Sequence, residues 1–455
     1  MNSLRLSQVV EGLNARIIGE DIDFSSVSSD TRTLQQGDLY VALRGLNFDG
    51  HRFVDQAIDK GAAAVMVSES LDRTIPQIQV ANTRLGLGRL AGLWRERFDV
   101  PLVAITGSNG KTTVKELLAA CLRMHGPVLA TQGNLNNDIG LPLTLLGLQE
   151  ESYAVVEMGA NHPGEIGYLS QIAHPDVAVI TNAGAAHLEG FGDLQSVARA
   201  KGEILNGLKP SGIAVLNADD DYFPLWRELL GERRMLSFGA SERAAVRSDL
   251  TQAEMRWTEE GFLSHMTVSF RDERFEVKLS LTGRHNLMNG LAAIAAALSM
   301  GCSVSEIQQG FASMRSVAGR LQLLFAPSGF YLIDDSYNAN PDSVHAAIEV
   351  LRKAPGEQYL VLGDLAELGD ESVALHSNIG TQARQAGLRH LYALGRLSGH
   401  AADSFGDGGR AFSELDDLAD ALHAAVRPGD TLLIKGSRGA AMERVVHRLM
   451  DDGRG

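Results

Sequence analysis

The chain has 455 residues, which is too long for one ordinary hydrophobic core and agrees with about three domains. Its hydrophobic content of 44% and its 48 glycines are typical of a globular α/β protein and exclude a disordered one. The formal net charge of −15 argues against a general surface for nucleic acid or for membranes.

No apolar run approaches the ~18 residues needed to span a membrane, and the N-terminus lacks the basic and apolar regions of an export signal. We therefore expect a cytoplasmic protein with no membrane span and no nucleic-acid partner. The two cysteines, Cys121 and Cys302, lie in apolar helical patterns. They are expected to be reduced core residues, because two such thiols support neither a disulfide nor a zinc site.

Residues 1–82 are expected to form a small α/β domain. Apolar runs predict strands at 38–43 and 63–67, and a helical pattern predicts a helix at 52–60. Residues 83–315 are expected to form a second, central domain.

This central domain begins with a helix from Thr83 that leads into an apolar strand at 102–105. Helical patterns separate the next strands and predict a parallel sheet with right-handed crossovers; those strands lie at 153–156, 177–181 and 213–216. Charged, alternating residues at 244–281 predict peripheral antiparallel strands, and an alanine-rich helix follows at 285–300.

Residues 316–455 are expected to form a third domain in which a strand and a helix alternate four times. This pattern predicts a small doubly wound, Rossmann-like sheet. The strands lie at 331–334, 359–362, 390–394 and 431–434, and the helices at 343–353, 374–386, 414–426 and 440–450.

The most informative motif is the segment at 100–113, V-P-L-V-A-I-T-G-S-N-G-K-T-T. A buried strand, a glycine turn and a helix N-terminus together form a cradle for phosphate. Lys111 would reach the β- and γ-phosphates, and the Thr112 hydroxyl would hold Mg²⁺. The spacing departs from the usual P-loop, since Gly107 lies three residues before Gly110, but a chance glycine turn rarely carries all these parts. The segment predicts ATP binding through Gly107, Ser108, Asn109, Gly110, Lys111, Thr112 and Thr113.

Three further residues are candidate metal ligands. Glu157 ends an apolar strand beside the P-loop, where an acid is well placed for Mg²⁺, although it could instead face solvent. His187 follows another strand end, where a structural hydrogen bond is an equal alternative. Lys201 lies on a predicted helix and is either a solvated lysine or a buried amine that reacts with CO₂ to form a carbamate.

Polar residues near the third domain suggest nucleotide contacts. Asn286 and Asn289 lie one helical turn apart and could both bind adenine, or His285 or Asn286 could cap the helix. Arg320 could reach a γ-phosphate and Asp335 a ribose, or they could form a salt bridge at a hinge. The stretch K-G-S-R at 435–438 is a candidate anion site or a plain turn between strand and helix.

These motifs together resemble one family closely, the Mur ligases of peptidoglycan synthesis, over essentially the whole chain. The resemblance rests on T-G-S-N-G-K-T-T at 106–113, Glu157, His187, Lys201, H-N-L-M-N at 285–289, Gly319-Arg320 and Asp335. It implies three domains: one for a uridine nucleotide, one P-loop domain for ATP, and one Rossmann-like domain for the incoming amine.

The resemblance also implies roles for single residues. Lys111, Thr112 and Glu157 would hold phosphate and a first Mg²⁺, and His187 with a CO₂-derived carbamate on Lys201 would hold a second. Adenine, γ-phosphate and ribose would be contacted by Asn286, Asn289, Arg320 and Asp335. One further asparagine near the metals is left open among Asn134, Asn136 and Asn137.

Several stretches are similar to the branch of the family that adds D-alanyl-D-alanine to a UDP-N-acetylmuramoyl-tripeptide. They are G-N-L-N-N-D-I-G-L-P at 133–142, D-D-S-Y-N-A-N-P at 334–341, G-D-L-A-E-L-G at 363–369 and K-G-S-R-G-A-A-M-E at 435–443. The implied contacts of the two substrates are Ser29, Asp30, Arg32, Asp49, His51, Asn137, Tyr337, Asn338, Lys435 and Arg438.

Two alternatives stay within the enzymes. The tripeptide-forming Mur ligase carries an Asp-Asn-Pro-Arg signature that is absent here, since Y-N-A-N-P stands at 337–341. A folylpolyglutamate-synthase-like ligase shares the P-loop and the modified lysine, but not the uridine-type first domain. The implied reaction is ATP-driven amide formation through an acyl phosphate, by a protein expected to be a monomer. A nucleotide-binding regulator without catalysis is disfavoured, because all the proposed ligands are present.

Overall fold

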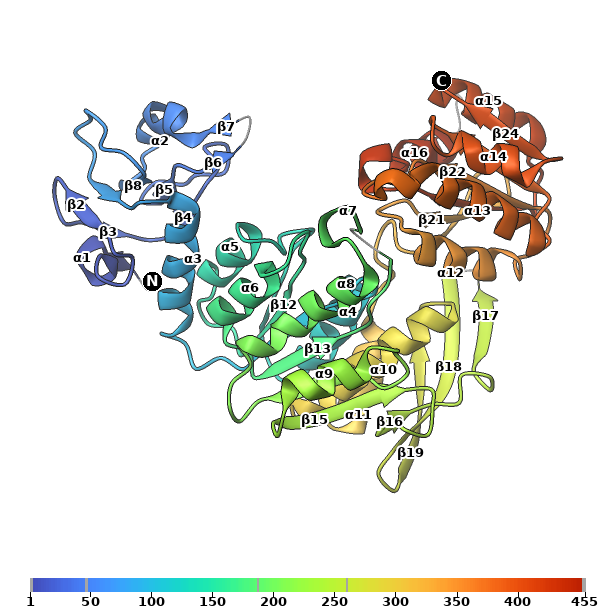
Figure 1. The fold of residues 1–455 in the computed structure, drawn as a ribbon, viewed down its shortest axis with the longest axis horizontal. Helices are drawn as coiled ribbons and strands as arrows, with labels where there is room; N and C mark the ends of the chain where they lie inside the picture. Colours follow the sequence, from blue (N-terminus) through green and yellow to red (C-terminus); the bar gives the residue numbers. More distant parts are fainter. Residues whose placement is uncertain (1–2, 46–47, 186–187, 259–260, 452–455) are drawn as a thin grey trace.

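The computed structural model describes residues 3–45, 48–185, 188–258 and 261–451. Three units follow one another along the long axis of the molecule, coloured blue, then green to yellow, then orange to red (Figure 1). Each unit is built around its own larger sheet. The chain is therefore an α/β protein of three units.

The N-terminal unit contains a five-stranded sheet of order β2-β9-β8-β5-β4, in which β2 alone runs antiparallel to its neighbour. The predicted strands and helix of this unit are confirmed as β5, β8 and α2. The bounds are β2 Arg16–Ile18, β4 Val27–Ser28, β5 Leu39–Val41, β8 Ala64–Val67, β9 Gln77–Gln79, α1 Leu6–Val9 and α2 Val54–Asp59. Two short pairs join β1 Leu4–Arg5 to β3 Asp23–Phe24, and β6 Arg44–Gly45 to β7 Phe48–Asp49.

Helix α3 (Thr83–Arg95) connects this unit to the central one. Asn82 caps it, since its side chain accepts hydrogen bonds from the backbone N–H groups of Arg84 and Leu85. The Thr83 hydroxyl donates to the carbonyl of Ala42, at 2.9 Å, and so fixes the first turn to the N-terminal sheet. The rest of α3 packs against α5 (Gly140–Leu146) and α6 (Glu165–Ala173) of the central unit. Its first turn therefore lies where the two units meet (Figure 1).

The central unit contains a ten-stranded sheet of order β11-β12-β10-β13-β14-β15-β16-β18-β17, with β19 paired to β18. The strands from β11 to β16 are parallel, and β17, β18 and β19 are antiparallel, as the sequence predicts. The bounds are β10 Leu102–Thr106, β11 Val128–Ala130, β12 Tyr153–Glu157, β13 Val177–Ile180, β14 Ile213–Asn217, β15 Arg234–Gly239, β16 Val246–Arg247, β17 Glu254–Thr258, β18 Gly261–Phe270 and β19 Glu273–Leu279.

Two layers of helices cover the parallel part of this sheet. Alternate residues of β10 point into different cores, Leu102 and Ala104 into one and Val103 and Ile105 into the other, which explains the continuous apolar run. On one face lie α5 Gly140–Leu146, α6 Glu165–Ala173, α8 Leu194–Gly202 and α9 Phe223–Leu230, and on the other α4 Lys111–Leu122, α10 Arg284–Ser299 and α11 Val304–Ser313. A short helix, α7 (Leu188–Phe191), precedes α8.

The two cysteines are buried free thiols. Cys121 lies in α4 as predicted, but Cys302 lies in the turn between α10 and α11. The helical prediction for Cys302 is therefore wrong, because the alanine-rich helix already ends at Ser299.

The C-terminal unit contains a six-stranded sheet of order β20-β21-β25-β22-β23-β24, parallel except for β20. The predicted fourfold alternation is incomplete, since β20, α14 and β24 were not predicted. The edge strands β20 and β24 are only four residues long and contain no buried residue, and β24 has no apolar run. The bounds are β20 Gln322–Phe325, β21 Tyr331–Asp335, β22 Gln358–Gly363, β23 His390–Leu394, β24 Gly409–Phe412, β25 Thr431–Lys435, α12 Pro341–Leu351, α13 Ser372–Gln385, α14 Gly399–Phe405, α15 Leu415–Ala425 and α16 Glu443–Met450.

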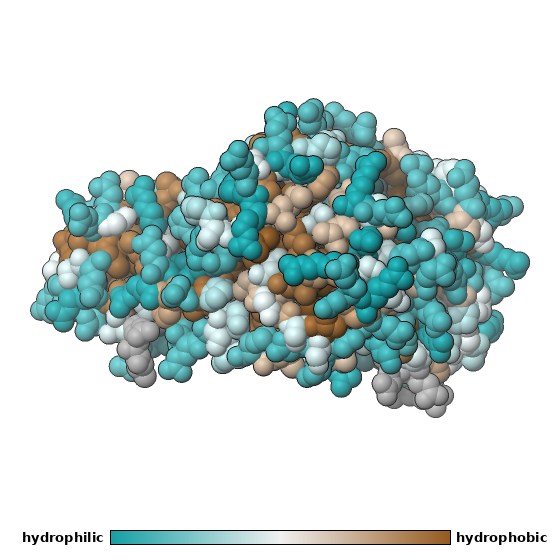
Figure 2. Space-filling view, turned by 90° about the horizontal axis from the view of Figure 1, so that it is seen from below, coloured by the Kyte–Doolittle hydropathy of each residue, from teal (hydrophilic) through white to brown (hydrophobic). Residues whose placement is uncertain are grey.

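Seen from below, the surface is mostly hydrophilic, and apolar side chains are visible in patches between polar ones (Figure 2). Within the described ranges, no helix combines the length and the apolar character needed to cross a bilayer.

Candidate active site

A cavity of about 690 Å³ is lined by both the central and the C-terminal units. It lies at the carboxyl ends of parallel strands in both sheets, where open α/β sheets bind ligands. The predicted site residues that line it are Ser108, Asn109, Gly110, Lys111, Thr112, Thr113, Asn137, Glu157, Lys201, Asn286, Asn289, Arg320, Asp335, Tyr337, Asn338, Lys435 and Arg438. Predicted residues scattered over more than 300 positions of sequence are thus brought to one place.

The P-loop follows β10 directly and requires its glycines. Gly110, the residue before α4, has a φ of +86°, and a Cβ there would lie 2.1 Å from Oδ1 of Asn289. Gly107 has a φ of +145°, and a Cβ there would collide with the hydroxyl of Thr181. Any side chain at these positions would displace the loop, so backbone conformation and close packing require glycine at both.

Lys111 opens α4, and its ammonium group donates to the carbonyl of Gly107 at 2.6 Å. Burial lowers the pKa of Lys111 to about 8; Glu157 opposes this shift and Arg320 adds to it. At neutral pH the side chain still carries its proton, so it supplies a positive charge next to the glycine turn.

Arg320 brings a second positive charge to the P-loop from the start of the C-terminal unit. Its guanidinium donates to the hydroxyl of Thr112 at 3.0 Å and lies 4.4 Å from the ring centroid of Tyr337. The Tyr337 backbone N–H in turn donates to the carbonyl of Gly319. This stack holds the arginine over the first turn of α4, where a terminal phosphate would lie.

Glu157 and Lys201 are almost completely buried, at 1% exposure each. Oε1 of Glu157 has no hydrogen-bond partner, and its nearest cation, Nζ of Lys115, is 3.6 Å away. Nζ of Lys201 forms no hydrogen bond or ion pair with another described residue. The alternatives of a solvent-facing acid and a solvated lysine are therefore excluded.

The pKa of Lys201 is lowered to about 7, mainly by burial and to a smaller extent by the charge of Lys111. The amine is thus largely uncharged slightly above neutral pH, as reaction with CO₂ requires. An orphaned carboxylate oxygen and such an amine fit a divalent cation and a carbamate. No cluster of three histidine, cysteine or acidic side chains that could hold a metal occurs in the described ranges, and the predicted ligand His187 lies outside the described residues.

Asn286 and Asn289 lie side by side in the first turns of α10, as the sequence predicts. The amide of Asn286 donates to the carbonyl of Thr282 at 2.9 Å, and that of Asn289 donates to Oδ1 of Asn286 at 3.1 Å. The helix is preceded by Gly283, and no side chain caps it. The capping alternative is therefore wrong, and both amides are held in fixed orientations at the cavity.

Asp335 and Lys435 end the adjacent strands β21 and β25 and form a buried ion pair. Lys435 also donates to the carbonyl of Asn338 at 3.1 Å, and the other oxygen of Asp335 accepts from the backbone N–H of Leu321. These groups stabilise the strand ends. Arg438 is more open, with its side chain 63% exposed and paired with Glu443 at 3.0 Å.

The three candidate asparagines differ in their surroundings. Oδ1 of Asn137 accepts from the N–H groups of Ile139 and Gly140 and so starts α5. The amide of Asn136 packs against Gly159, where a Cβ would lie 3.0 Å from its Oδ1. Asn136 is thus the candidate closest to the chain segment that follows Glu157, whereas Asn134 is exposed.

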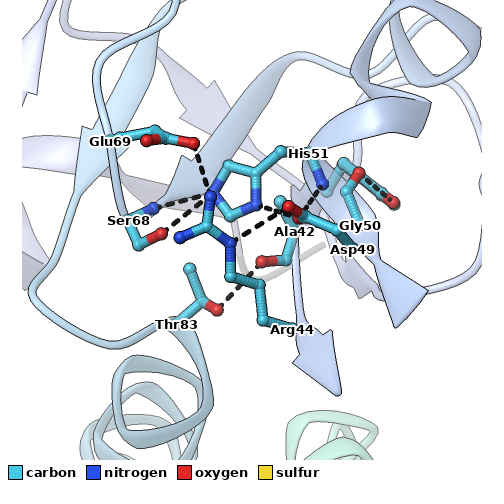
Figure 3. A network of polar contacts seen from close by, with 9 residues as sticks. Ala42, Arg44, Asp49, Gly50, His51, Ser68, Glu69 and Thr83 are labelled. Atoms are coloured by element: carbon cyan, nitrogen blue, oxygen red, sulfur yellow. Dashed lines mark hydrogen bonds and ion pairs between the residues drawn. The ribbon is translucent and has the colours of Figure 1, made fainter. Parts of the chain in front are cut away.

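The predicted uridine-binding residues of the N-terminal unit do not line this cavity, and neither does Gly107. His51 accepts from the Ser68 N–H through Nε2, so its Nδ1 carries the hydrogen that points to Asp49 at 2.7 Å (Figure 3). Arg44 links Asp49 to Glu69 in the same network.

Asp30 and Arg32 are paired within the loop after β4, and Ser29 precedes them. The side chain of Arg32 is 88% exposed, which leaves it accessible to an anion. These positions remain a prediction for the uridine nucleotide.

Three contacts at the cavity were missed by the sequence analysis. Asn340 donates to Oδ1 of Asn109 at 2.8 Å, and Asp342 accepts from the N–H of Ala185 at 2.9 Å. Arg84 of α3 pairs with Asp138 at 2.8 Å. Asn340 and Asp138 lie within motifs that the sequence singled out, but no local periodicity indicates their partners.

Comparison with known proteins gives three family matches along the chain. Residues 23–93 match the Mur ligase family catalytic domain, residues 105–297 the Mur ligase middle domain, and residues 319–438 the Mur ligase glutamate ligase domain. A curated relative, UDP-N-acetylmuramoyl-tripeptide–D-alanyl-D-alanine ligase of Escherichia coli (strain K12), is 44% identical over 100% of both chains.

Solved structures agree with these matches. A structure of UDP-N-acetylmuramoylalanyl-D-glutamyl-2,6-diaminopimelate–D-alanyl-D-alanyl ligase from Acinetobacter baumannii is 33% identical, covers 99% of both chains and has a TM-score of 0.89. MurF ligase from Thermotoga maritima in complex with ADP is 31% identical, with 94% of this chain and 97% of that chain covered and a TM-score of 0.83. The chain therefore belongs to the Mur ligase family.

Proposed function

We propose that this chain is an ATP-dependent ligase that joins D-alanyl-D-alanine to UDP-N-acetylmuramoyl-tripeptide in peptidoglycan precursor synthesis. The observation that carries the proposal is the shared cavity, in which Lys111 and Arg320 meet the buried Glu157 and Lys201. Relatives with this activity in their names align with the whole chain. The likeness to an ADP-bound relative supports ATP as the nucleotide.

The first step transfers phosphate to the donor peptide. An oxygen of the terminal carboxylate attacks the γ-phosphorus, the bond to the bridging oxygen breaks, and ADP leaves with that oxygen. Two anions approach each other in this step, so Lys111 and Arg320 offset their repulsion and stabilise the charge that spreads over the phosphate. Asn286 and Asn289 orient the adenine, and Asp335 is the proposed partner of the ribose.

Mg²⁺ is the divalent cation that such a site would take. Thr112 and Glu157 would hold a first ion, and His187 with Lys201 in its carbamate form a second. Bound Mg²⁺ neutralises phosphate charge. The orphaned oxygen of Glu157 and the lowered pKa of Lys201 support these assignments.

The second step forms the amide. The free amine of D-alanyl-D-alanine attacks the acyl carbon of the acyl phosphate, phosphate leaves, and the nitrogen loses a proton. Arg438 and the strand ends near Tyr337 and Asn338 are proposed to hold the dipeptide, since Arg438 offers an open cation to its carboxylate. Closure of the C-terminal unit over the P-loop would exclude water from the labile intermediate.

The N-terminal unit is proposed to hold the uridine diphosphate through Ser29, Asp30, Arg32, Asp49 and His51. The name of the relative from A. baumannii includes 2,6-diaminopimelate as part of the donor. We propose the same third residue in the donor peptide of this chain. The domains are proposed to extend over residues 1–82, 83–315 and 316–455, in a cytoplasmic monomer.

ADP release with a panel of UDP-muramoyl peptides, with and without D-alanyl-D-alanine, tests this function. We expect turnover only with the tripeptide donor, and with the dipeptide preferred strongly over single amino acids. Turnover of a dipeptide donor with a single diamino acid would instead support the tripeptide-forming alternative. Turnover of a folate with glutamate would support the folylpolyglutamate-synthase-like one.

A further inference from the structure

The ion pair between Arg84 and Asp138 lines the same cavity as the P-loop. Arg84 lies in the first turn of α3, next to the N-terminal unit, and Asp138 lies in the loop before α5. A donor held by its nucleotide in the N-terminal unit must bring its carboxylate to Lys111. The peptide of the donor therefore approaches the wall that Arg84 and Asp138 form.

This pair differs from the buried ion pair of the cavity wall between Lys435 and Asp335. Lys435 and Asp335 are buried, with side-chain exposures of 3% and 14%, and both make further hydrogen bonds within the protein. Arg84 and Asp138 keep side-chain exposures of 47% and 30%, and no other hydrogen bond between described residues involves either side chain. An exposed pair of this kind adds little to stability and can exchange its partners for those of a ligand.

We infer that Arg84 and Asp138 bind the far end of the third residue of the donor peptide and select 2,6-diaminopimelate over lysine. This inference rests on the proposed function. The side chain of 2,6-diaminopimelate ends in both an ammonium and a carboxylate group. Arg84 donates to that carboxylate and Asp138 accepts from the ammonium, so the internal ion pair is replaced by two intermolecular ones.

The charges explain the selectivity. A lysine side chain offers only an ammonium group, so Asp138 would gain a partner while Arg84 would lose its own. A site built for two charged groups disfavours an analogue that lacks one of them, because a polar group is then left unpaired. The reacting carboxylate has other cations to approach, because Lys111 and Arg320 also line the cavity.

The test compares three donors that differ only at the third residue: 2,6-diaminopimelate, its derivative amidated at the distal carboxyl group, and lysine. We expect the wild type to have a kcat/KM at least ten-fold higher for the first donor than for the other two. Arg84→Met should reduce this ratio at least ten-fold. Arg84→Lys keeps a cation and should retain part of the preference.

Arg89→Met is the matched control, because Arg89 lies on the same helix but does not line the cavity, and its guanidinium bonds to the carbonyl of Leu13. It should leave the ratio unchanged. Calorimetric titration of each donor into the protein with a non-hydrolysable ATP analogue gives the same comparison without turnover.

The inference would be overturned if Arg84→Met lowered kcat/KM equally for all three donors, or if the wild type showed no preference among the donors. The pair would then only connect α3 to the loop before α5. If the wild type ligates none of these donors, the proposed function itself fails, and the two failures are therefore distinguishable.

Discussion

Asn340 donates a hydrogen bond to Asn109 across 2.8 Å and so connects the C-terminal unit to the P-loop. Asn340 precedes α12, and its own Oδ1 accepts from the backbone N–H of Ser343. Two residues on, Asp342 accepts from the N–H of Ala185 in the loop after β13. The strand ends that would hold the dipeptide are thus fixed relative to the loop that would hold ATP.

We predict that Asn340→Asp lowers kcat roughly ten-fold, which corresponds to about 1.4 kcal/mol. The carboxylate can still cap α12, but it places an oxygen against Oδ1 of Asn109 where an amide donor was. The melting temperature should therefore stay close to that of the wild type. Steady-state ligation assays and thermal unfolding measure both effects.

Asn340→Ala is the companion variant, since it removes the cap as well as the bond to Asn109. It should lower kcat similarly and also reduce the free energy of unfolding by about 1 kcal/mol. A wild-type kcat in Asn340→Asp would show that this contact has no part in the reaction.

Lys111→Ala should reduce kcat by at least ~10²-fold, because a preorganised charge beside the transferring phosphate is lost. The structure supports a local effect, since the bonds of the ammonium group to described residues go to carbonyls of its own loop, those of Gly107 and Ser108. Rates of ADP release, with thermal unfolding as the check on folding, measure the loss. A variant within a few-fold of the wild type would exclude the P-loop assignment.

Lys201→Ala should also be nearly inactive, through loss of a metal ligand and not of a positive charge. A small carboxylate such as acetate should then restore part of the activity, because it can enter the vacated space and replace the carbamate oxygens. Lys201→Arg keeps a charge but forms no carbamate, so it should stay inactive. Normal turnover by Lys201→Arg would contradict the carbamate hypothesis.

The carbamate also predicts a pH dependence. Burial and the nearby Lys111 lower the pKa of Lys201 to about 7, so the neutral, reactive amine predominates at pH 8 and the protonated amine at pH 6. Protein depleted of CO₂ should regain activity on addition of bicarbonate at pH 8 and much less at pH 6, when both samples are assayed at one common pH. Equal recovery of activity at pH 8 and at pH 6 would contradict the hypothesis that the amine of Lys201 titrates between them.

The sequence predicts the parts of this molecule that depend on local patterns. The strand before Gly107 is a continuous apolar run because helices cover both its faces, and the glycine turn and helix follow in fixed order. The shared face of Asn286 and Asn289 follows from helical spacing alone. These features were correctly predicted because neighbours in sequence determine them.

Contacts between distant segments could not be predicted in this way. Arg84 and Asp138 are both ordinary surface residues by pattern, and only the packing of α3 on α5 brings them together. Strand β24 was not predicted because it has only four residues, of which the middle two are exposed and none is buried. The role of Asn137 as a helix start is likewise visible only once the loop conformation is known.

Arg438→Ala should raise the KM for D-alanyl-D-alanine roughly ten-fold or more, the effect of losing a charge-assisted hydrogen bond to a carboxylate. The KM for ATP should change little, because the guanidinium that bonds to Thr112 of the P-loop is that of Arg320, whereas that of Arg438 lies 5.7 Å from the ring centroid of Tyr337. Arg444→Ala is the control, since that side chain is exposed on α16 and, among the described residues, bonds to the carbonyl of Ala441 alone. Steady-state kinetics with each substrate varied separately test this assignment. Equal increases in the KM for ATP and in the KM for the dipeptide would exclude Arg438 from the acceptor site.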